Sequence, residues 1–295
     1  MLTDSTPWVF GALALVPLLP WGLHRAIRRG LAAPRVVETQ TPSGLPWQQV
    51  RIPTCNGRQL HAWWIPAAVE TAPALVVMHG WGGNAEMMLP LAGPLHRAGY
   101  ALLLVDARCH GRSDDDSFAS LPRFAEDIEA GLDWLAGLAV VDPARLGVIG
   151  HSVGAGAALL AASRRSALRA VVSLAAFAHP EVMMKRWLAS KHVPYWPLGA
   201  YILAYVQRVI GHRFDAIAPV NTIARVACPV LLVHGLADEM VPLSDAEAIL
   251  AAGLPGRVHL LPVPGSHDDY GDIDRNLPAL TTFLAAAFND PPAAT

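Results

Sequence analysis

The chain has 295 residues and a net charge of −2, with 53% hydrophobic and 16% charged residues. A globular domain usually carries about 25% charged residues, so this composition excludes a disordered or highly charged chain. No long basic run is present, which argues against a nucleic-acid-binding protein. The three cysteines, Cys55, Cys109 and Cys228, form no Cys-x-x-Cys pair, which argues against a zinc knuckle or a disulfide framework. None of these features fixes an oligomeric state.

Residues 5–23 contain no charged side chain, and Trp8 and Trp21 lie near the two ends of this stretch. A helix of this length spans roughly 28 Å, which is enough to cross the hydrocarbon core of a bilayer. Positive charges follow the stretch, whereas a cleaved signal peptide carries them before it. These charges are Arg25, Arg28, Arg29 and Arg35. We therefore predict an uncleaved membrane anchor, with the main domain on the cytoplasmic side.

Two alternatives remain open for this N-terminal stretch. Pro17 and Pro20 each remove a helix hydrogen bond, so the segment could be a kinked helix that lies on the membrane surface. It could also pack against the domain of a soluble cytoplasmic protein. Residues 30–46 follow it and are rich in proline and glycine, which is typical of a linker.

Strand patterns and helix patterns alternate along the rest of the chain. Short apolar or alternating runs predict strands at 47–54, 60–66, 74–79, 100–106, 145–150, 169–174, 229–234 and 257–263. Helical spacing of apolar residues predicts helices at 84–98, 121–138, 152–163, 244–252 and 276–288. Repeated units of this kind predict a mostly parallel sheet with helices on both faces.

One region interrupts this alternation. Residues 177–218 show no strand pattern but contain much apolar, aromatic and basic material, so we expect a helical cap there. We therefore expect an N-terminal hydrophobic anchor at 1–29, a linker at 30–46, and one α/β domain at 47–290 that carries the cap.

The sequence Gly150-His151-Ser152-Val153-Gly154 lies directly between an expected strand and an expected helix. A sharp turn at this place holds the serine in a strained backbone conformation and lifts its hydroxyl out of the sheet. Crowded backbone around such a turn requires small residues, which explains the two glycines. The pattern predicts that Ser152 is a nucleophile.

A serine hydroxyl needs a base to take its proton and an acid to orient that base. Asp238 follows the expected strand at 229–234, and His267 follows the expected strand at 257–263. The chain order Ser152, Asp238, His267 is the order expected of a triad on such a sheet. We predict His267 as the base and Asp238 as the acid, with Glu239 as the alternative acid.

A tetrahedral intermediate also needs two backbone N–H donors. One should come from Val153, which follows the nucleophile. The other should come from the glycine-rich loop after the strand at 74–79, where Trp81 is the expected donor. No pair of histidines has metal spacing such as His-Glu-x-x-His, so the sequence implies no metal and no cofactor.

Together these motifs resemble the α/β-hydrolase superfamily, and most closely its serine aminopeptidase and monoacylglycerol-lipase-like branch. The resemblance extends from about Trp47 to Phe288. One departure is Cys109, where the motif Asp-x-Arg-Gly-His-Gly-x-Ser of that branch has a glycine. The matching motifs are the elbow, the loops of Asp238 and His267, His79-Gly80-Trp81-Gly82-Gly83 and Asp106-Ala107-Arg108-Cys109-His110-Gly111-Arg112-Ser113.

The resemblance implies an α/β-hydrolase fold with an eight-stranded sheet, a helical cap after the sixth strand, and acyl transfer to water. The expected function is therefore hydrolysis of carboxylic esters through an acyl-enzyme on Ser152. The expected partner is a small-molecule or lipid-like ester, because the cap combines aromatic, apolar and basic residues beside the N-terminal stretch. A peptidase or amidase, an acyltransferase and a noncatalytic binding protein of the same fold remain alternatives.

Overall fold

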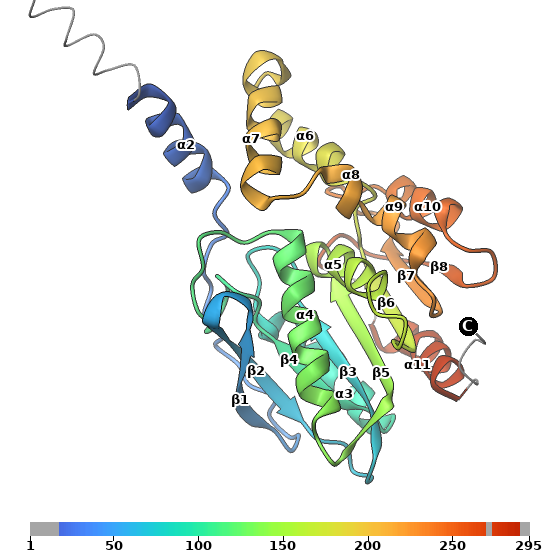
Figure 1. The fold of residues 1–295 in the computed structure, drawn as a ribbon. Helices are drawn as coiled ribbons and strands as arrows, with labels where there is room; N and C mark the ends of the chain where they lie inside the picture. The colour runs from blue at the N-terminus through green and yellow to red at the C-terminus, as the bar shows by residue number, and fades with distance from the viewer. Residues whose placement is uncertain (1–17, 270–272, 290–295) are drawn as a thin grey trace, which may run out of the picture. The chain divides into compact units, whose positions relative to one another are not determined.

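A computed structural model describes residues 18–269 and 273–289 of the chain (Figure 1). The chain divides into two compact units, residues 1–33 and residues 34–295. In the first unit, α2 (Leu18–Gly30) has Arg28 and Arg29 in its last turn, and the guanidinium of Arg25 lies 5.7 Å from the ring centre of the exposed Trp21. Basic residues at this end of a helix interact favourably with its dipole.

Most of the stretch predicted to cross a membrane, 5–23, lies outside the described residues. Among the helices of the described part, none has the length and apolar character that a bilayer crossing requires. The structure therefore does not support a spanning helix within residues 18–269 and 273–289, and the membrane anchor stays a prediction.

The second unit is built on one eight-stranded sheet in the order β1-β2-β4-β3-β5-β6-β7-β8. The β1–β2 hairpin and the β2–β4 pair are antiparallel, and all other neighbours are parallel. This mostly parallel sheet confirms the predicted fold class. The strands are β1 (Gln48–Thr54), β2 (Arg58–Ile65), β3 (Ala72–Met78), β4 (Ala101–Val105), β5 (Val141–His151), β6 (Ala170–Leu174), β7 (Val230–Gly235) and β8 (Val258–Val263).

Helices cover both faces of the sheet (Figure 1). On one face, α3 (Leu89–Arg97) and α11 (Ile273–Asn289) pack in a buried apolar cluster with alternate residues of β3, β4 and β7. On the other face lie α4 (Leu121–Ala136) and α5 (Val153–Ala162), where Gly131 lets α4 approach β3 and β4 closely. The central strands are therefore buried on both faces, as their continuous apolar runs predicted.

The insertion between β6 and β7 is helical, and it forms the cap of the domain, yellow to orange in Figure 1. Arg186 of this cap forms two hydrogen bonds, of 2.9 and 2.8 Å, with Asp245, which lies in α10 (Leu243–Ala252). This buried carboxylate ties the cap to the body of the domain. The elements of the insertion are α6 (Pro180–Ser190), η3 (Tyr195–Gly199), α7 (Ala200–Ile210), α8 (Phe214–Ile217), α9 (Pro219–Thr222) and η4 (Ile223–Arg225).

The helix predicted at 84–98 is divided in the structure. It begins as a 3₁₀ turn, η2 (Ala85–Met88), and continues as α3 from Leu89. The side chain of Asn84 caps the turn by accepting a hydrogen bond from the backbone N–H of Glu86. Pro90 lies in the first turn of α3, where its missing N–H leaves no helix hydrogen bond unmade.

Candidate active site

Ser152 sits at the sharp turn between β5 and α5, with φ 54° and ψ −115°. This strained conformation is held from both sides. The backbone N–H of Ser152 donates to the carbonyl of Leu174 at 2.8 Å, and a Cβ on Gly150 or Gly154 would overlap backbone atoms of the turn and of β3. The predicted elbow is therefore present, and its two glycines are required by close backbone contact.

The structure brings the three predicted triad residues together. The Ser152 hydroxyl donates to Nε2 of His267 at 3.0 Å, and Nδ1 of His267 donates to Oδ2 of Asp238 at 2.8 Å. All three side chains are buried, with at most 9% of each residue exposed. A base that is hydrogen-bonded to both a hydroxyl and a carboxylate has the geometry needed to take the serine proton.

Asp238 is the acid that reaches the histidine, and Glu239 is not. The other carboxylate oxygen of Asp238, Oδ1, accepts hydrogen bonds from the backbone N–H groups of Met240 and Val241, at 2.9 and 2.8 Å. These bonds fix the carboxylate so that Oδ2 faces His267. Glu239, the alternative acid, is exposed.

Val153 and the loop that carries Trp81, the two predicted sources of oxyanion donors, adjoin the nucleophile. Val153 is the first residue of α5, and the first N–H groups of a helix have no partner within the helix. The loop that carries Trp81 begins at Gly80, where a Cβ would lie 3.1 Å from the Cβ of Ser152. Gly80 therefore brings this loop into contact with the serine. We call residues 80–86 the oxyanion loop.

His79 joins the oxyanion loop to the loop after β4. Its Nδ1 donates to the carbonyl of Gly80 at 2.6 Å, and its Nε2 accepts from the backbone N–H of Ala107 at 3.0 Å. The ring needs one N–H and one lone pair for these two bonds, so it must be neutral. Burial, followed by the nearby His110, lowers the pKa of His79 to about 4.

This lowered pKa predicts a pH-dependent stability. Between pH 6.5 and about 4, the unfolded chain binds a proton on His79 that the folded chain does not bind. The free energy of unfolding should therefore fall as the pH falls through this window, by about 3 kcal/mol in full. Urea unfolding at pH 7 and pH 4.5 should show a smaller decrease for His79→Gln than for the natural chain. Equal decreases in both proteins would contradict the assignment.

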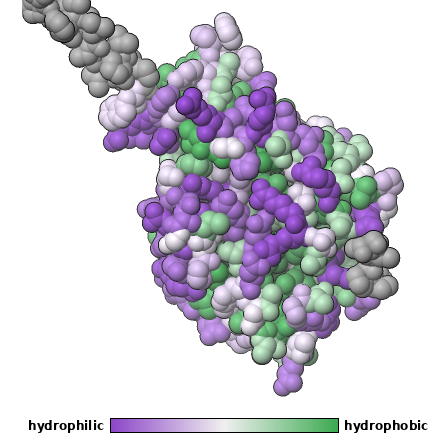
Figure 2. All heavy atoms as spheres, viewed as in Figure 1, coloured by the Kyte–Doolittle hydropathy of each residue, from purple (hydrophilic) through white to green (hydrophobic). Residues whose placement is uncertain are grey.

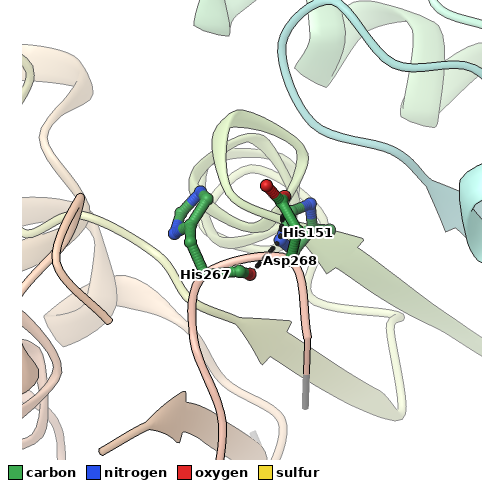
Figure 3. A group of neighbouring side chains, drawn as sticks. All are labelled: His151, His267 and Asp268. Carbon is green, nitrogen blue, oxygen red and sulfur yellow. Dashed lines mark hydrogen bonds and ion pairs between the residues drawn. The ribbon is translucent and has the colours of Figure 1, made fainter. Parts of the chain in front are cut away.

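His151, the second residue of the elbow, holds the loop that carries His267. Its Nε2 donates to the backbone carbonyl of His267 at 3.0 Å, and the two rings lie 5.1 Å apart (Figure 3). The same ring packs against Gly80, where a Cβ would lie 2.9 Å from its Nδ1. His151 thus contacts both the base and the oxyanion loop. Its position in the elbow was the only sequence signal for this role.

Among the described residues, two groups of side chains have donor atoms close enough to surround a metal ion. They are His151, His267 and Asp268, shown in Figure 3, and Glu38, His61 and Asp106. In the first group both ring nitrogens of His267 already bond Ser152 and Asp238. In the second, Nδ1 of His61 bonds Asp106 at 3.0 Å. A metal ion at either place would have to replace these hydrogen bonds.

Comparisons with known proteins agree with this architecture. A profile of the prolyl oligopeptidase family matches residues 123–253, a stretch that includes Ser152 and Asp238. An uncharacterized protein of Mycobacterium tuberculosis is 30% identical over 223 residues, which are 75% of this chain and 73% of that protein. The chain belongs to the α/β-hydrolase superfamily.

Solved structures share the α/β-hydrolase fold with this chain. An esterase of Pyrococcus furiosus superposes with a TM-score of 0.72 at 22% identity, covering 88% of this chain and 98% of the esterase. Est1E of Butyrivibrio proteoclasticus, solved with ferulic acid, superposes with a TM-score of 0.65 at 22% identity, covering 82% of this chain and all of Est1E. The narrower branch expected from the motifs stays a prediction.

Cys109 occupies the position at which the motif of that branch has a glycine. It has φ 67°, in the left-handed region where a glycine costs no strain. Its thiol lies between the backbone N–H and carbonyl of Asp116, at 3.3 and 3.6 Å, and burial raises its pKa. A raised pKa lowers the fraction of thiolate, which disfavours Cys109 as a nucleophile.

Proposed function

We propose that the protein is a serine hydrolase that cleaves carboxylic esters through an acyl-enzyme on Ser152. The hydrogen-bonded chain from Ser152 through His267 to Asp238 carries this proposal. As the Ser152 oxygen attacks the ester carbonyl, its proton passes to Nε2 of His267. The backbone N–H groups of Trp81 and Val153 then bind the developing oxyanion, and His267 returns the proton to the leaving alcohol.

Deacylation uses the same groups in reverse. A water molecule attacks the acyl carbonyl and gives a proton to Nε2 of His267, and Ser152 takes that proton back as the acid leaves. Asp238 keeps Nδ1 of His267 protonated in both halves of the reaction, so that Nε2 is always the atom that exchanges protons. No metal or cofactor takes part in these steps.

The cap supports a hydrophobic, lipid-like acyl group as the substrate class. Its η3 and α7 present large apolar or aromatic side chains to solvent, and Trp196 is 78% exposed. Lys185 adds a positive charge 4.7 Å from the ring of Tyr195. Figure 2 shows hydrophilic residues among pale and apolar ones over this part of the domain. The exposed apolar and aromatic residues here are Val182, Tyr195, Trp196, Leu198 and Tyr201.

One labelling experiment tests both parts of the proposal. Fluorophosphonates with a short and a long alkyl chain react with an activated serine, which displaces fluoride from phosphorus. Both probes should label the natural chain and neither should label Ser152→Ala. The long-chain probe should label faster, because the cap offers apolar surface to it. Absence of labelling in folded protein would favour a noncatalytic binding protein.

A peptidase is the second candidate, and the match to the prolyl oligopeptidase family favours it. The same triad can attack an amide, whose leaving amine takes the proton from His267. An ester and an anilide with the same acyl group distinguish the two. Hydroxide cleaves the ester faster than the anilide by a ratio that can be measured without enzyme. The ester proposal expects the ratio of the two kcat/KM values to exceed this uncatalysed ratio.

A further inference from the structure

Residues 34–39, which we call the strap, run along the oxyanion loop within the second unit. The ring of Pro34 lies so close to Gly82 that a Cβ there would be 2.9 Å from it. The side chain of Asn84 donates to the carbonyl of Val36 at 3.1 Å. These two contacts follow one another in the same order along the strap and the oxyanion loop. A third contact, with Glu86, continues the series.

That third contact is formed by Thr39 at the end of the strap. Its backbone N–H and its hydroxyl both donate to the carboxylate of Glu86, at 2.6 and 2.9 Å. These bonds lower the pKa of Glu86, as expected when a carboxylate accepts hydrogen bonds. The strap thus holds both ends of the segment from Gly82 to Glu86.

Glu38 is the buried centre of the strap, with 1% of its side chain exposed. Nε of Arg112 donates to Oε2 of Glu38 at 2.8 Å, and Oε1 of Glu38 lies 3.3 Å from Nδ1 of His61, which donates to Asp106 at 3.0 Å. Asp106 in turn accepts the backbone N–H of Ala85 at 2.7 Å. Glu38 therefore reaches the oxyanion loop through the carboxylate that anchors it.

When two buried acids lie close together, the charge of one disfavours ionisation of the other. Burial, with the hydrogen bond and charge of Asp106, raises the pKa of Glu38. Burial alone would raise the pKa of Asp106 as well, but hydrogen bonds from His61 and Glu38 outweigh it and lower that pKa to about 2. Removing the Glu38 side chain therefore takes away the acceptor of Arg112 and the second carboxylate beside His61, the residue that donates to Asp106.

We propose that the strap positions the oxyanion loop, and that Glu38 is the residue through which it does so. This inference rests on the proposed serine hydrolase function. Glu38 touches no reacting atom; it acts by keeping Asp106 bonded to Ala85, so that the backbone N–H of Trp81 faces the developing oxyanion. The oxyanion site then depends on the strap, which lies outside the sequence motifs of the superfamily.

Kinetics of the full-length Glu38→Ala protein test this proposal. An oxyanion donor acts mainly in the transition state, so misplacing it lowers kcat and leaves KM nearly unchanged. We expect kcat on a short, water-soluble ester to fall by about tenfold or more, with KM within about threefold. The affinity for a trifluoromethyl ketone, which forms a tetrahedral adduct on serine, should fall by the same factor as kcat/KM.

Two further variants separate positioning from lost stability. Glu38→Gln keeps the shape of the side chain and an oxygen that can accept from Arg112, so it should restore most of kcat. Leu132→Ala removes a buried side chain of α4 away from the strap and should lower stability without changing kcat. If Glu38→Ala does not fold, Glu86→Ala at the surface replaces it, with kcat lowered about threefold and KM unchanged.

The proposal is overturned if the folded Glu38→Ala and Glu86→Ala proteins keep the natural kcat and inhibitor affinity. A raised KM with unchanged kcat would also overturn it, because that result indicates lost substrate binding. Failure of the proposed function looks different: the natural chain would then show no ester turnover, or its turnover would persist in Ser152→Ala. The two failures are therefore distinguished by the Ser152 variant measured in the same assay.

Discussion

Replacing Ser152 or His267 with alanine should lower kcat on a short, water-soluble ester by about 10³-fold or more, with the fold intact. Ser152 forms the bond to the acyl group, and His267 is the residue whose Nε2 lies 3.0 Å from its hydroxyl. Without either group, the acyl-enzyme cannot form at a useful rate. Steady-state kinetics on purified variants, with circular dichroism to confirm folding, measure the effect.

The double variant provides the internal control for this prediction. Residues that act as one unit are not additive, so Ser152→Ala with His267→Ala should be little slower than either single variant. Independent losses that multiply would show that the two residues do not work in one step. Near-normal turnover in a clean, folded Ser152→Ala preparation would remove Ser152 from the mechanism.

The sheet and the elbow could be predicted because their signals are local. A strand buried on both faces gives a continuous apolar run, as in β3 and β4, and all eight strands were expected close to their observed bounds. The elbow requires glycine at positions 150 and 154 for backbone packing, and this requirement is visible in five consecutive residues. Asp238 and His267 could be found because each follows a strand.

Contacts between distant segments could not be predicted in this way. Residues 30–46 have the composition of a linker, yet Glu38 within them is buried against residues 74 positions later in the chain. The bond from His151 to the carbonyl of His267 joins residues 116 positions apart. Neither contact leaves a periodic pattern in the sequence, because each depends on how the finished sheet places its loops.

The hydrogen-bond partners of individual buried side chains also could not be predicted from the sequence. His79, at the end of β3, is buried and packs against Phe124. Its two bonds, to Gly80 and Ala107, nevertheless give it a tautomer and a lowered pKa. Hydropathy cannot show this, since it distinguishes buried from exposed residues but not the partners of a buried ring.

Asp238→Asn should lower kcat by about 10³- to 10⁴-fold, even though the side chain keeps its shape. The reason lies in the second carboxylate oxygen. The N–H groups of Met240 and Val241 donate to Oδ1, so the oxygen of the new amide will stay with them and its NH₂ group will face His267. An NH₂ group donates, which forces Nδ1 of His267 to accept and places the proton on Nε2.

A histidine protonated at Nε2 cannot take the proton of Ser152, so the variant keeps the triad in place with the wrong tautomer. Glu239→Gln is the matched control, since the neighbouring acid is exposed and a change of charge there should alter kcat by less than about twofold. Both variants should fold and have similar KM values in the same ester assay. A large loss in Glu239→Gln together with an active Asp238→Asn would identify Glu239 as the acid. The 2.8 Å contact between Asp238 and His267 would then have no role in catalysis.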